Sequence, residues 1–395
     1  MKLPKPNDRA DLLKSRQRLK MARSAQTYVR GSTARFYQWL NEAANSLPEG
    51  PRLWICGDCH YGNLGPLSNA KGEVAIQIRD LDQTVIGNPT HDIVRLALSL
   101  ASAARGFDLP GAATAHIVEQ IVDGYQSALN GETASDDGDK PPLVRGLIRT
   151  SRQRGWTQLA RERIEDVTPA VPPGKRFWPL SREEREGLEA LVASDAVHDL
   201  VTLLHSRDSD APLALVDAAY WVKGCSSLGL LRYALLVAIG EGKRRELCLI
   251  DVKEAVKASA PHAPRAHMPK DNGERVVLGA RHLAPHLGDR MCAAHLLDRS
   301  VFVRELRPQD TKLEIETLEP REAVMVARFL AGVVGRAHRR QLDEADRKVW
   351  AAEFSRNRSK SLDAPSWLWT SVVELMAAHE AAYLEHCRRY ASVTA

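Results

Sequence analysis

Polar residues between positions 57 and 92 have the types and spacing that metal-assisted phosphoryl transfer requires. Transfer of a γ-phosphoryl group needs little covalent help, so the protein mainly orients a hydroxyl nucleophile and neutralises charge with Mg²⁺. In the run Gly57-Asp-Cys-His-Tyr-Gly-Asn63, the carboxylate of Asp58 could accept a hydrogen bond from that hydroxyl and align it. The amide oxygen of Asn63 and the carboxylate of Asp80 are hard oxygen ligands of the kind that Mg²⁺ prefers.

Further residues of the same stretch belong to this interpretation. Asp82, two positions beyond Asp80, could reach a second metal ion or brace the loop. His60 is expected to shape the loop rather than to bind a ligand. Asp92 stands at the start of the apolar run 93–100, where a carboxylate commonly caps a helix or braces a loop.

The same residues also have a purely structural interpretation. Val74, Ile76 and Ile78 alternate with other residues as in a strand, and Asp and Asn gather at strand ends for local hydrogen bonding. One such residue alone would be taken as structural, whereas the whole set in register favours the catalytic interpretation. Cys56 and Cys59 form a Cys-x-x-Cys pair, but no second pair at zinc spacing occurs, which disfavours thiol redox or zinc chemistry.

A second group of residues, far downstream, could bind phosphate. Residues 220–255 combine a glycine-rich turn between two predicted strands with a third strand that carries Lys253. Glycines let backbone N–H groups cover nucleotide phosphates, and a lysine on the adjoining strand can reach the phosphate oxygens. An ordinary β-hairpin is the alternative for the turn taken alone. The turn residues that we assign to nucleotide binding are Gly224, Ser226, Ser227 and Gly229.

The strand predicted over 300–306 would complete this nucleotide site. We expect residues 302–306 to form the linker whose backbone meets the adenine, with Arg304 and Glu305 as nucleotide-binding residues. An edge strand without a ligand is the alternative, and Arg304 could instead lie in a surface ion pair. His338 ends a long predicted helix and is expected to be a buried, hydrogen-bonded histidine rather than a catalytic one.

The order of the two groups is the reverse of that in ordinary kinases, which place the glycine loop and lysine before the catalytic loop. The spacing of Asp58, Asn63 and Asp80 resembles the catalytic and metal-binding loops of the aminoglycoside and choline phosphotransferase branch of the protein-kinase-like fold. Residues 213–340 followed by 50–130 would give the kinase order of glycine loop, lysine, helix, strand, linker, long helix, catalytic loop and metal loop. The resemblance therefore implies a circularly permuted kinase-like fold.

Stretches along nearly the whole chain resemble the bacterial family known as domain of unknown function 2252, which belongs with kinase-like proteins. One departure is Leu278, where the family often has an acidic residue that could pair with the strand lysine. In this chain Glu274 or Glu254 would have to pair with Lys253. The resembling stretches are Met21–Gly31, Trp54–Gly65, Gly224–Gly229, Val252–Ala255, Arg275–Gly279, Phe302–Arg307 and Arg336–His338.

The fold class that follows is α+β, a circularly permuted protein-kinase-like fold with a small antiparallel-sheet lobe and a large, mainly helical lobe. The resemblance divides the chain into consecutive parts. We expect a large lobe with the catalytic and metal loops over 1–130, a mobile loop and helical connection over 131–212, a small nucleotide-binding lobe over 213–307, and further large-lobe helices over 308–395.

Apolar periodicity and turn residues place the elements within these lobes. A turn is expected over 108–111 between two helices, and a mobile loop over 131–140. Prolines interrupt the charged, helical stretch 142–212. Helices are expected over 8–47, 91–129, 274–286, 322–340 and 366–390, and strands over 51–56, 73–79, 213–253 and 300–306.

Composition agrees with a two-lobed globular enzyme. The chain of 395 residues exceeds the usual size of one core, and a hydrophobic content of 44% is ordinary. No apolar run is long enough to span a bilayer, the N-terminus lacks a signal-peptide core, and the six cysteines are scattered. We therefore expect a cytoplasmic protein with no membrane contact. The basic residues 1–30 could bind nucleic acid, but a solvated helical face is favoured and nucleic acid is not expected as a partner.

Together these residues predict a phosphotransferase that uses ATP and Mg²⁺ and acts on an unknown hydroxyl-bearing acceptor, either a small molecule or a protein. Two alternatives use the same fold. One is a nucleotidyl transferase that binds ATP reversed and moves AMP, and the other is a non-catalytic nucleotide-binding regulator. The regulator is disfavoured because pseudoenzymes commonly lose the acidic or lysine positions that are all present here. Resemblance of fold alone does not decide among the three.

Overall fold

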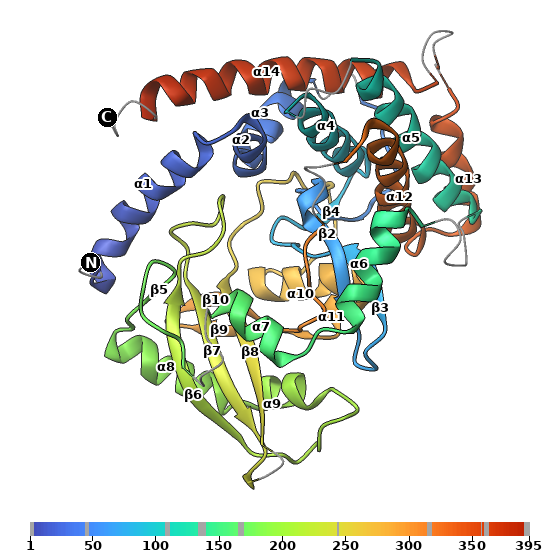
Figure 1. Ribbon diagram of the computed structural model, residues 1–395. Coiled ribbons are helices and arrows are strands. Elements are labelled where there is room, and N and C mark those ends of the chain that lie inside the picture. Colours follow the sequence, from blue (N-terminus) through green and yellow to red (C-terminus); the bar gives the residue numbers. More distant parts are fainter. Residues whose placement is uncertain are drawn as a thin grey trace.

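The structure is a computed structural model that describes residues 4–43, 47–106, 111–132, 140–164, 170–242, 245–313, 318–356, 358 and 363–390. A six-stranded antiparallel sheet lies at one end and a body of helices at the other (Figure 1). The predicted α+β class with antiparallel sheets is confirmed. Most of the predicted turn over 108–111 and most of the predicted loop over 131–140 lie outside the described residues.

The large sheet has the order β5-β6-β7-β8-β10-β9, and all neighbouring strands are antiparallel. Its central strands are rich in Leu, Val and Ile because helices cover both faces. Helices α8 (Arg182–Val192) and α9 (Asp195–Thr202) pack on one face, and α7 (Trp156–Arg163) packs on the other. The strands are β5 (Phe177–Trp178), β6 (Leu213–Trp221), β7 (Arg232–Ile239), β8 (Glu246–Glu254), β9 (Met291–Leu296) and β10 (Arg299–Leu306).

Two small antiparallel sheets connect the large sheet to the helices. Helix α10 (Asn272–Leu283) lies between them and β9 and β10, and the Asp271 side chain caps it by accepting from the backbone N–H of Glu274 at 2.9 Å. The short helix α11 (Pro285–Gly288) follows. The small sheets pair β1 (Leu53–Ile55) with β4 (Val85–Gly87), and β2 (Leu64–Ser68) with β3 (Val74–Ile78).

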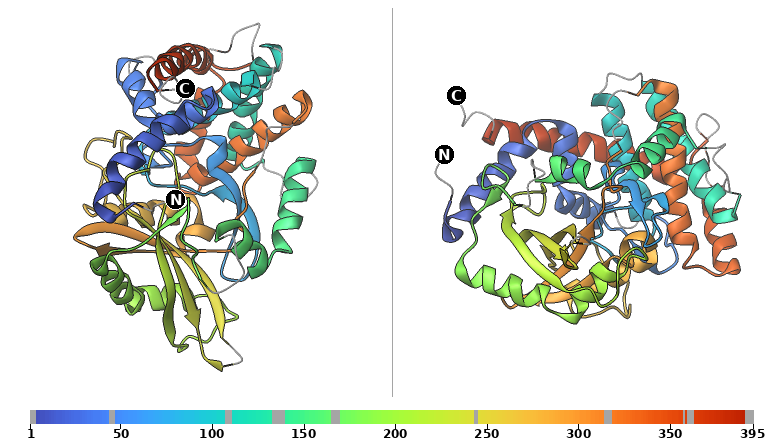
Figure 2. Two further views of the ribbon diagram at one scale, coloured as in Figure 1. Left: turned by 60° about the vertical axis from the view of Figure 1, so that its left-hand side comes forward. Right: turned by 60° about the horizontal axis from the view of Figure 1, so that its bottom comes forward.

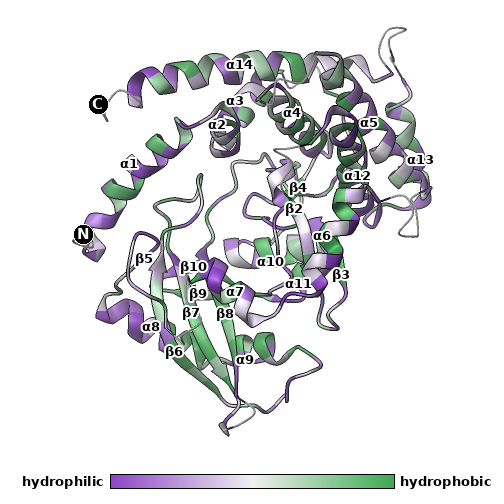
Figure 3. Cartoon of the chain, viewed as in Figure 1, coloured by the Kyte–Doolittle hydropathy of each residue, from purple (hydrophilic) through white to green (hydrophobic). Residues whose placement is uncertain are grey.

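Helices α5 and α12 form the closest pair of the helical body because glycines let their backbones approach. A Cβ on Gly124 of α5 would overlap the carbonyl oxygen of Arg328 in α12. Figure 3 shows hydrophobic residues concentrated in α4 and in the central strands of the large sheet. The helices of the body are α2 (Ala25–Gly31), α3 (Thr33–Ala43), α4 (Thr90–Gly106), α5 (Gly111–Asn130), α6 (Pro142–Arg152), α12 (Pro320–Arg339), α13 (Glu344–Glu353) and α14 (Ser366–Tyr390).

Helix α1 (Arg9–Met21), which follows a 3-10 turn at Pro6–Asp8, runs from the helical body to the large sheet (Figure 2). Arg9 forms a buried ion pair with Glu184 at 2.6 Å, and Leu13 is 1% exposed within the core beneath α8. The prediction of a solvated basic helical face is therefore only partly correct, because one side of α1 packs against other parts of the protein.

Some elements were not predicted. Strands β2, β4, β5 and β9 and helix α13 have no counterpart among the expected elements. The stretch 142–212 contains the predicted helices, as α6 to α9, together with β5. The helices within the described ranges include none with the length and apolar character that a membrane span needs.

Candidate functional site

The loop over 57–63 leaves β1 in a conformation that only glycine tolerates. Gly57 has a φ of +75°, and a Cβ there would overlap the carbonyl oxygen of Gln83. Asp92, fully buried at the start of α4, accepts hydrogen bonds from the backbone N–H of Cys56 at 2.7 Å and of Gly57 at 2.9 Å. Asp92 thus braces the loop, one of the two roles predicted for it.

Asp58 is held in one orientation by two partners. Its Oδ1 accepts from Arg95 Nε at 2.8 Å, and its Oδ2 accepts from Thr33 Oγ1 at 2.9 Å. Arg95 is completely buried, whereas 12% of the Asp58 side chain is exposed. A carboxylate oxygen has two acceptor positions, so each oxygen of Asp58 retains one for a further donor. The carboxylate is therefore positioned in advance.

Asn63 closes the loop on itself at the end of the 3-10 turn Tyr61–Asn63. Its Nδ2 donates to the backbone carbonyl of Asp58 at 3.0 Å, and its backbone N–H donates to the carbonyl of His60 at 2.8 Å. The first bond fixes the amide plane and leaves the Oδ1 atom for another partner. His60 is 4% exposed, and burial lowers its pKa to about 4, so it is neutral. Its role in shaping the loop stays a prediction.

Lys253, on β8, contacts two carboxylates of the segment after β3, at the junction between the large sheet and the helical body. Its Nζ lies 3.6 Å from Asp80 Oδ1 and donates a hydrogen bond to Asp82 Oδ2. The lysine side chain is 5% exposed, whereas half of the Asp80 side chain is exposed. Lys253 and Asp80, which the kinase-like interpretation assigns to phosphate and to metal, are therefore close in space. Asp82 lies 171 positions before Lys253 in the sequence.

The predicted partners of Lys253 are wrong. Glu254 points away from it, accepting from the backbone N–H of Leu231 at 2.8 Å and pairing with Arg299 at 3.2 Å. Glu274 is exposed on α10, where its backbone is capped by Asp271. Successive side chains of a strand point to opposite faces, so Glu254 could not share a target with Lys253.

The carboxylates of Asp80 and Asp82 differ in their affinity for protons. Burial raises the pKa of Asp82, the Asp80 carboxylate raises it further, and the resulting value is about 6. Partial desolvation also raises the pKa of Asp80, but the surrounding cations, first Lys253, outweigh it and hold that pKa well below its ordinary value. Asp80 is thus an anionic, half-exposed oxygen donor at neutral pH.

A buried group of ion pairs lies next to Lys253 on the sheet. Asp251, fully buried, accepts from Arg232 at 2.9 and 2.5 Å and from Arg304 Nη2 at 2.9 Å. Arg304 also donates to the carbonyl of Arg79, one position before Asp80, at 3.1 Å. The guanidinium group of Arg304 is therefore already engaged, and its predicted role in nucleotide binding stays a prediction.

The predicted linker is instead an interior strand. Residues 302–306 belong to β10, which pairs with β8 on one side and with β9 on the other. Glu305 points to the opposite face of the sheet from Arg304 and pairs with Arg207 at 2.9 Å, and its carbonyl accepts from Arg290 at 2.8 Å. The structure thus does not bring Glu305 to the junction.

The glycine-rich turn between β6 and β7 emerges directly beside Lys253, because Arg232 at the start of β7 pairs with Lys253 in register. Gly224 and Gly229 have φ values of +106° and +107°. Helix α1 supports the turn, with Lys20 Nζ donating to the carbonyl of Gly224 at 2.7 Å. Ser226 and Gly229 are exposed, and Ser227 is half-buried.

The middle of the sheet face beyond the ion pairs is closed. Leu159 and Ala160 of α7 pack there against Ala234, Leu236 and Leu249. A void of about 10 Å³, lined by residues that include Asp80, Lys253 and Arg304, lies between the sheet and the metal-loop carboxylates.

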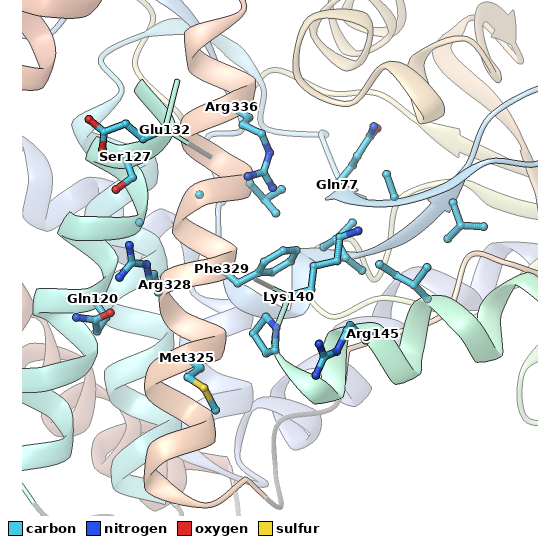
Figure 4. Close-up of a pocket in the computed structure, with 18 of the residues that line it drawn as sticks. Gln77, Gln120, Ser127, Glu132, Lys140, Arg145, Met325, Arg328, Phe329 and Arg336 are labelled. Carbon is cyan, nitrogen blue, oxygen red and sulfur yellow. The ribbon is translucent and has the colours of Figure 1, made fainter. Parts of the chain in front are cut away.

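A much larger cavity of about 680 Å³ lies elsewhere, between α5, α12, α6 and β3 (Figure 4). Phe329 and Met325 give it an apolar wall, and Arg336 and Arg328 lie on the same helix. None of the residues predicted for catalysis, metal or nucleotide lines it. Volume alone thus does not identify the site where the chemistry-bearing residues gather.

The Cys-x-x-Cys pair belongs to a structural network. Atoms of Cys56, Cys59 and Asp92 that could bind a metal lie within 4.8 Å of one another. A hydrogen bond from Cys59 and burial raise the pKa of the Cys56 thiol well above its ordinary value, so the thiol is protonated. The Asp92 carboxylate already accepts hydrogen bonds from the loop backbone and lies 3.2 Å from His338 Nε2. His338 Nδ1 is hydrogen-bonded to the Tyr125 hydroxyl at 2.9 Å. His338 is buried and hydrogen-bonded, as predicted.

The residues that support the candidate site residues were not predicted from the sequence. Arg95 is the lone charge within the apolar run 93–104, and a charged residue in such a run signals a buried partner. Arg232 and Asp251 lie on neighbouring strands, and only the strand register shows that they pair. Lys20 and Gln17, which support the glycine turn, lie one helical turn apart on α1.

The fold and the site define an α+β protein in which an antiparallel sheet and a helical body meet at a cluster of carboxylates around one buried lysine. A family model described as "Uncharacterized protein conserved in bacteria (DUF2252)" matches residues 9–389. The chain belongs to this family, as its stretches predicted. No curated protein and no solved structure gives a significant match.

Proposed function

We propose that this protein is a phosphotransferase that uses ATP and Mg²⁺, with a circularly permuted protein-kinase-like fold. The order of the elements supports this proposal. Read from β6, the chain gives a hairpin with a glycine turn, the lysine strand β8, helix α10, strands β9 and β10, and the long helix α12. Read from β1, it gives the loop with Asp58, the loop with Asp80 and helix α4.

The observation that carries the proposal is the meeting of Lys253 with Asp80 beside the loop of Asp58 and Asn63. In protein kinases a strand lysine binds phosphate oxygens, while an Asp and an Asn hold the metal ions. The Lys253 to Asp80 distance of 3.6 Å leaves both within reach of one triphosphate. The half-exposed carboxylate of Asp80 beside the buried Lys253 is open to a further ligand.

The residues fit a magnesium site by the chemistry of their donors. Asn63 Oδ1 and an Asp80 carboxylate oxygen are the hard donors that would hold Mg²⁺, and Asp82 is engaged with Lys253. When bound, Mg²⁺ would neutralise charge on the β- and γ-phosphates. Lys253 would exchange its contact with Asp82 for a phosphate oxygen, and the exposed backbone of the glycine turn would cover the phosphates.

Asp58 then has the role of aligning the acceptor. Its carboxylate would accept a hydrogen bond from the acceptor hydroxyl, whose oxygen forms the new bond to the γ-phosphorus as the bond to the β-phosphate oxygen breaks. The hydroxyl proton passes to Asp58 or to a phosphate oxygen, and ADP leaves. Arg95 and Thr33 keep the carboxylate in place throughout.

The experiment that tests the proposal uses ATP labelled separately at the α- and γ-phosphates. The protein is incubated with each label, Mg²⁺, and protein and small-molecule fractions from a bacterial lysate. We expect label from the γ-phosphate alone to appear in an acceptor. Label transferred from the α-phosphate would indicate AMP transfer instead, and absence of transfer from either position with every fraction would favour the regulator.

A further inference from the structure

We propose that the acceptor is a small molecule bearing a phosphate or a similarly charged anionic group, and that Arg30 and Lys312 bind this group beside the loop of Asp58. This inference rests on the proposed phosphotransferase function and adds the chemical class of its second substrate. It concerns basic side chains that none of the steps described above uses.

Arg30 lies against the loop that would orient the acceptor hydroxyl. It is at the C-terminal end of α2, and a Cβ on Gly62 would be 3.2 Å from its Cζ atom. Gly62 stands directly before Asn63 and four positions after Asp58. The guanidinium group is thus next to the backbone that presents both residues.

Lys312 reaches the same region from the segment that follows β10. The carbonyl oxygen of the preceding residue, Thr311, would be 3.0 Å from a Cβ on Gly65, two residues beyond Asn63. Thr311 Oγ1 is also hydrogen-bonded to Ser151 Oγ at 2.8 Å, which fixes the segment on α6. The Lys312 side chain is exposed at the end of this anchored segment.

Lys312 stands near other basic side chains. Partial desolvation lowers the pKa of its ammonium group, and Arg30, Arg163, Arg79 and Lys20 lower it further. Neither Arg30 nor Lys312 forms an ion pair with any residue that the structure describes. Such a cluster attracts anions, because a bound anion relieves the repulsion among its members.

Two neighbouring arginines have unused donors. The buried Nε atoms of Arg79 and Arg163 have no hydrogen-bond partner, and both guanidinium groups are tied to the carbonyl of Asp310 through Nη2, at 3.3 and 3.2 Å. The carboxylate of Asp310 itself is bound to Arg290 at 3.0 Å. The cations near Lys312 therefore lack a carboxylate of their own, in contrast to Arg232 and Arg304, which share Asp251.

The position of the cluster suits an acceptor better than the nucleotide. Lys253 and the glycine turn are placed for the triphosphate, whereas Arg30 lies against Gly62 in the loop that carries Asp58, which would orient the acceptor hydroxyl. Cationic acceptors such as choline or an aminoglycoside would be repelled there. The side chains converge from α1, α2 and the segment after β10 and do not form an extended stripe, which favours a compact anion over a nucleic-acid strand.

The test uses inorganic phosphate as the probe. It is titrated by calorimetry into protein saturated with Mg²⁺ and a non-hydrolysable ATP analogue. Arg30→Gln and Lys312→Gln should each weaken phosphate binding about tenfold, because each removes a charge-assisted contact. Arg35→Gln is the matched control. Arg35 is exposed on α3, where its guanidinium group is hydrogen-bonded to Gln38 at 3.4 Å, so this variant should bind phosphate like the wild type.

The outcomes separate this inference from the function on which it rests. Absence of phosphate binding, or equal binding in both variants and the control, would overturn the anion site, as would transfer of the γ-phosphate to choline. Displacement of phosphate by a single-stranded oligonucleotide would overturn the small-molecule acceptor and indicate a nucleic-acid polymer instead. If the nucleotide analogue fails to bind while phosphate binding still depends on Arg30 and Lys312, the anion site stands and the phosphotransferase function fails.

Discussion

Asp80→Asn should abolish the stabilisation that Mg²⁺ and ATP give to the protein while leaving the fold intact. The substitution keeps the shape of the side chain and removes its charge. Half of the Asp80 side chain is exposed, and Lys253 keeps its hydrogen bond to Asp82. We therefore expect the free energy of unfolding without ligand to change by no more than about 1 kcal/mol, the range of exposed ion pairs.

The expected loss can be worked out from linkage. A ligand at a concentration 100 times its Kd stabilises a protein by about 2.7 kcal/mol. Unfolding entropy is about 2.1 cal/mol/K per residue, which for 395 residues gives roughly 0.8 kcal/mol/K. The wild-type protein should therefore gain roughly 3 °C in Tm with the nucleotide and Mg²⁺. The variant should gain close to none, because the carboxylate that holds the ion is missing.

The assay is thermal unfolding followed by fluorescence, with and without Mg²⁺ and a non-hydrolysable ATP analogue. Glu42→Gln is the matched control, since Glu42 is an exposed carboxylate on α3 to which we assign no part in the site. The control should retain the full shift, and chelation of Mg²⁺ should remove it from the wild type. An undiminished shift in Asp80→Asn would refute the reasoning and show that Asp80 is structural.

The remaining predictions concern catalysis, pH and packing. Asp58→Ala should preserve nucleotide affinity in calorimetry but lower γ-phosphate transfer by orders of magnitude, since alignment is lost; unchanged turnover would reject Asp58 as the catalytic residue. Burial lowers the pKa of His379 to about 4. The unfolded chain therefore binds more protons than the folded protein between about pH 4 and 6.5. The free energy of unfolding should fall as the pH falls through that window, by up to roughly 3 kcal/mol at about pH 4. Denaturant unfolding of His379→Gln should show a smaller acid loss than the wild type, and an equal loss would contradict this assignment. Gly124→Ala should lower stability by about 2 kcal/mol through overlap with the Arg328 carbonyl, whereas Gly146→Ala, with open space at the Cβ, should be neutral or stabilising in the same unfolding assay; equal effects would refute the close packing of α5 and α12.

The sequence predicted those elements whose periodicity is strong. Alternation at Val74, Ile76 and Ile78 predicted β3, and the long apolar stripes predicted α4, α5, α12 and α14. Strand β2, Leu64-Gly-Pro-Leu-Ser68, was missed because glycine and proline at its centre are poor strand formers, and it exists by pairing with β3. Strand β9 has alanines where a typical strand has branched residues, and its place beside β10 depends on tertiary contacts.

The candidate site was predicted where its residues are close in sequence. Asp58 and Asn63 lie in one loop, and Asp80 directly follows the short sheet of β2 and β3, so their spacing in the sequence is enough to indicate the site. The partner of Lys253 could not be found in this way, because Asp82 lies 171 positions away in the sequence and only the packed fold brings the two residues together. The role of β10 as an interior strand likewise depends on β9, which the sequence did not reveal.

The measurement that tests the central claim most directly is a crystal structure of the protein with Mg²⁺ and a non-hydrolysable ATP analogue. We predict a metal ion between Asn63 Oδ1 and the Asp80 carboxylate, phosphate oxygens on Lys253, and the γ-phosphate facing Asp58 beneath the turn of Gly224 to Gly229. A nucleotide bound elsewhere, such as in the cavity between α5 and α12, with Lys253 still paired to Asp82, would contradict it.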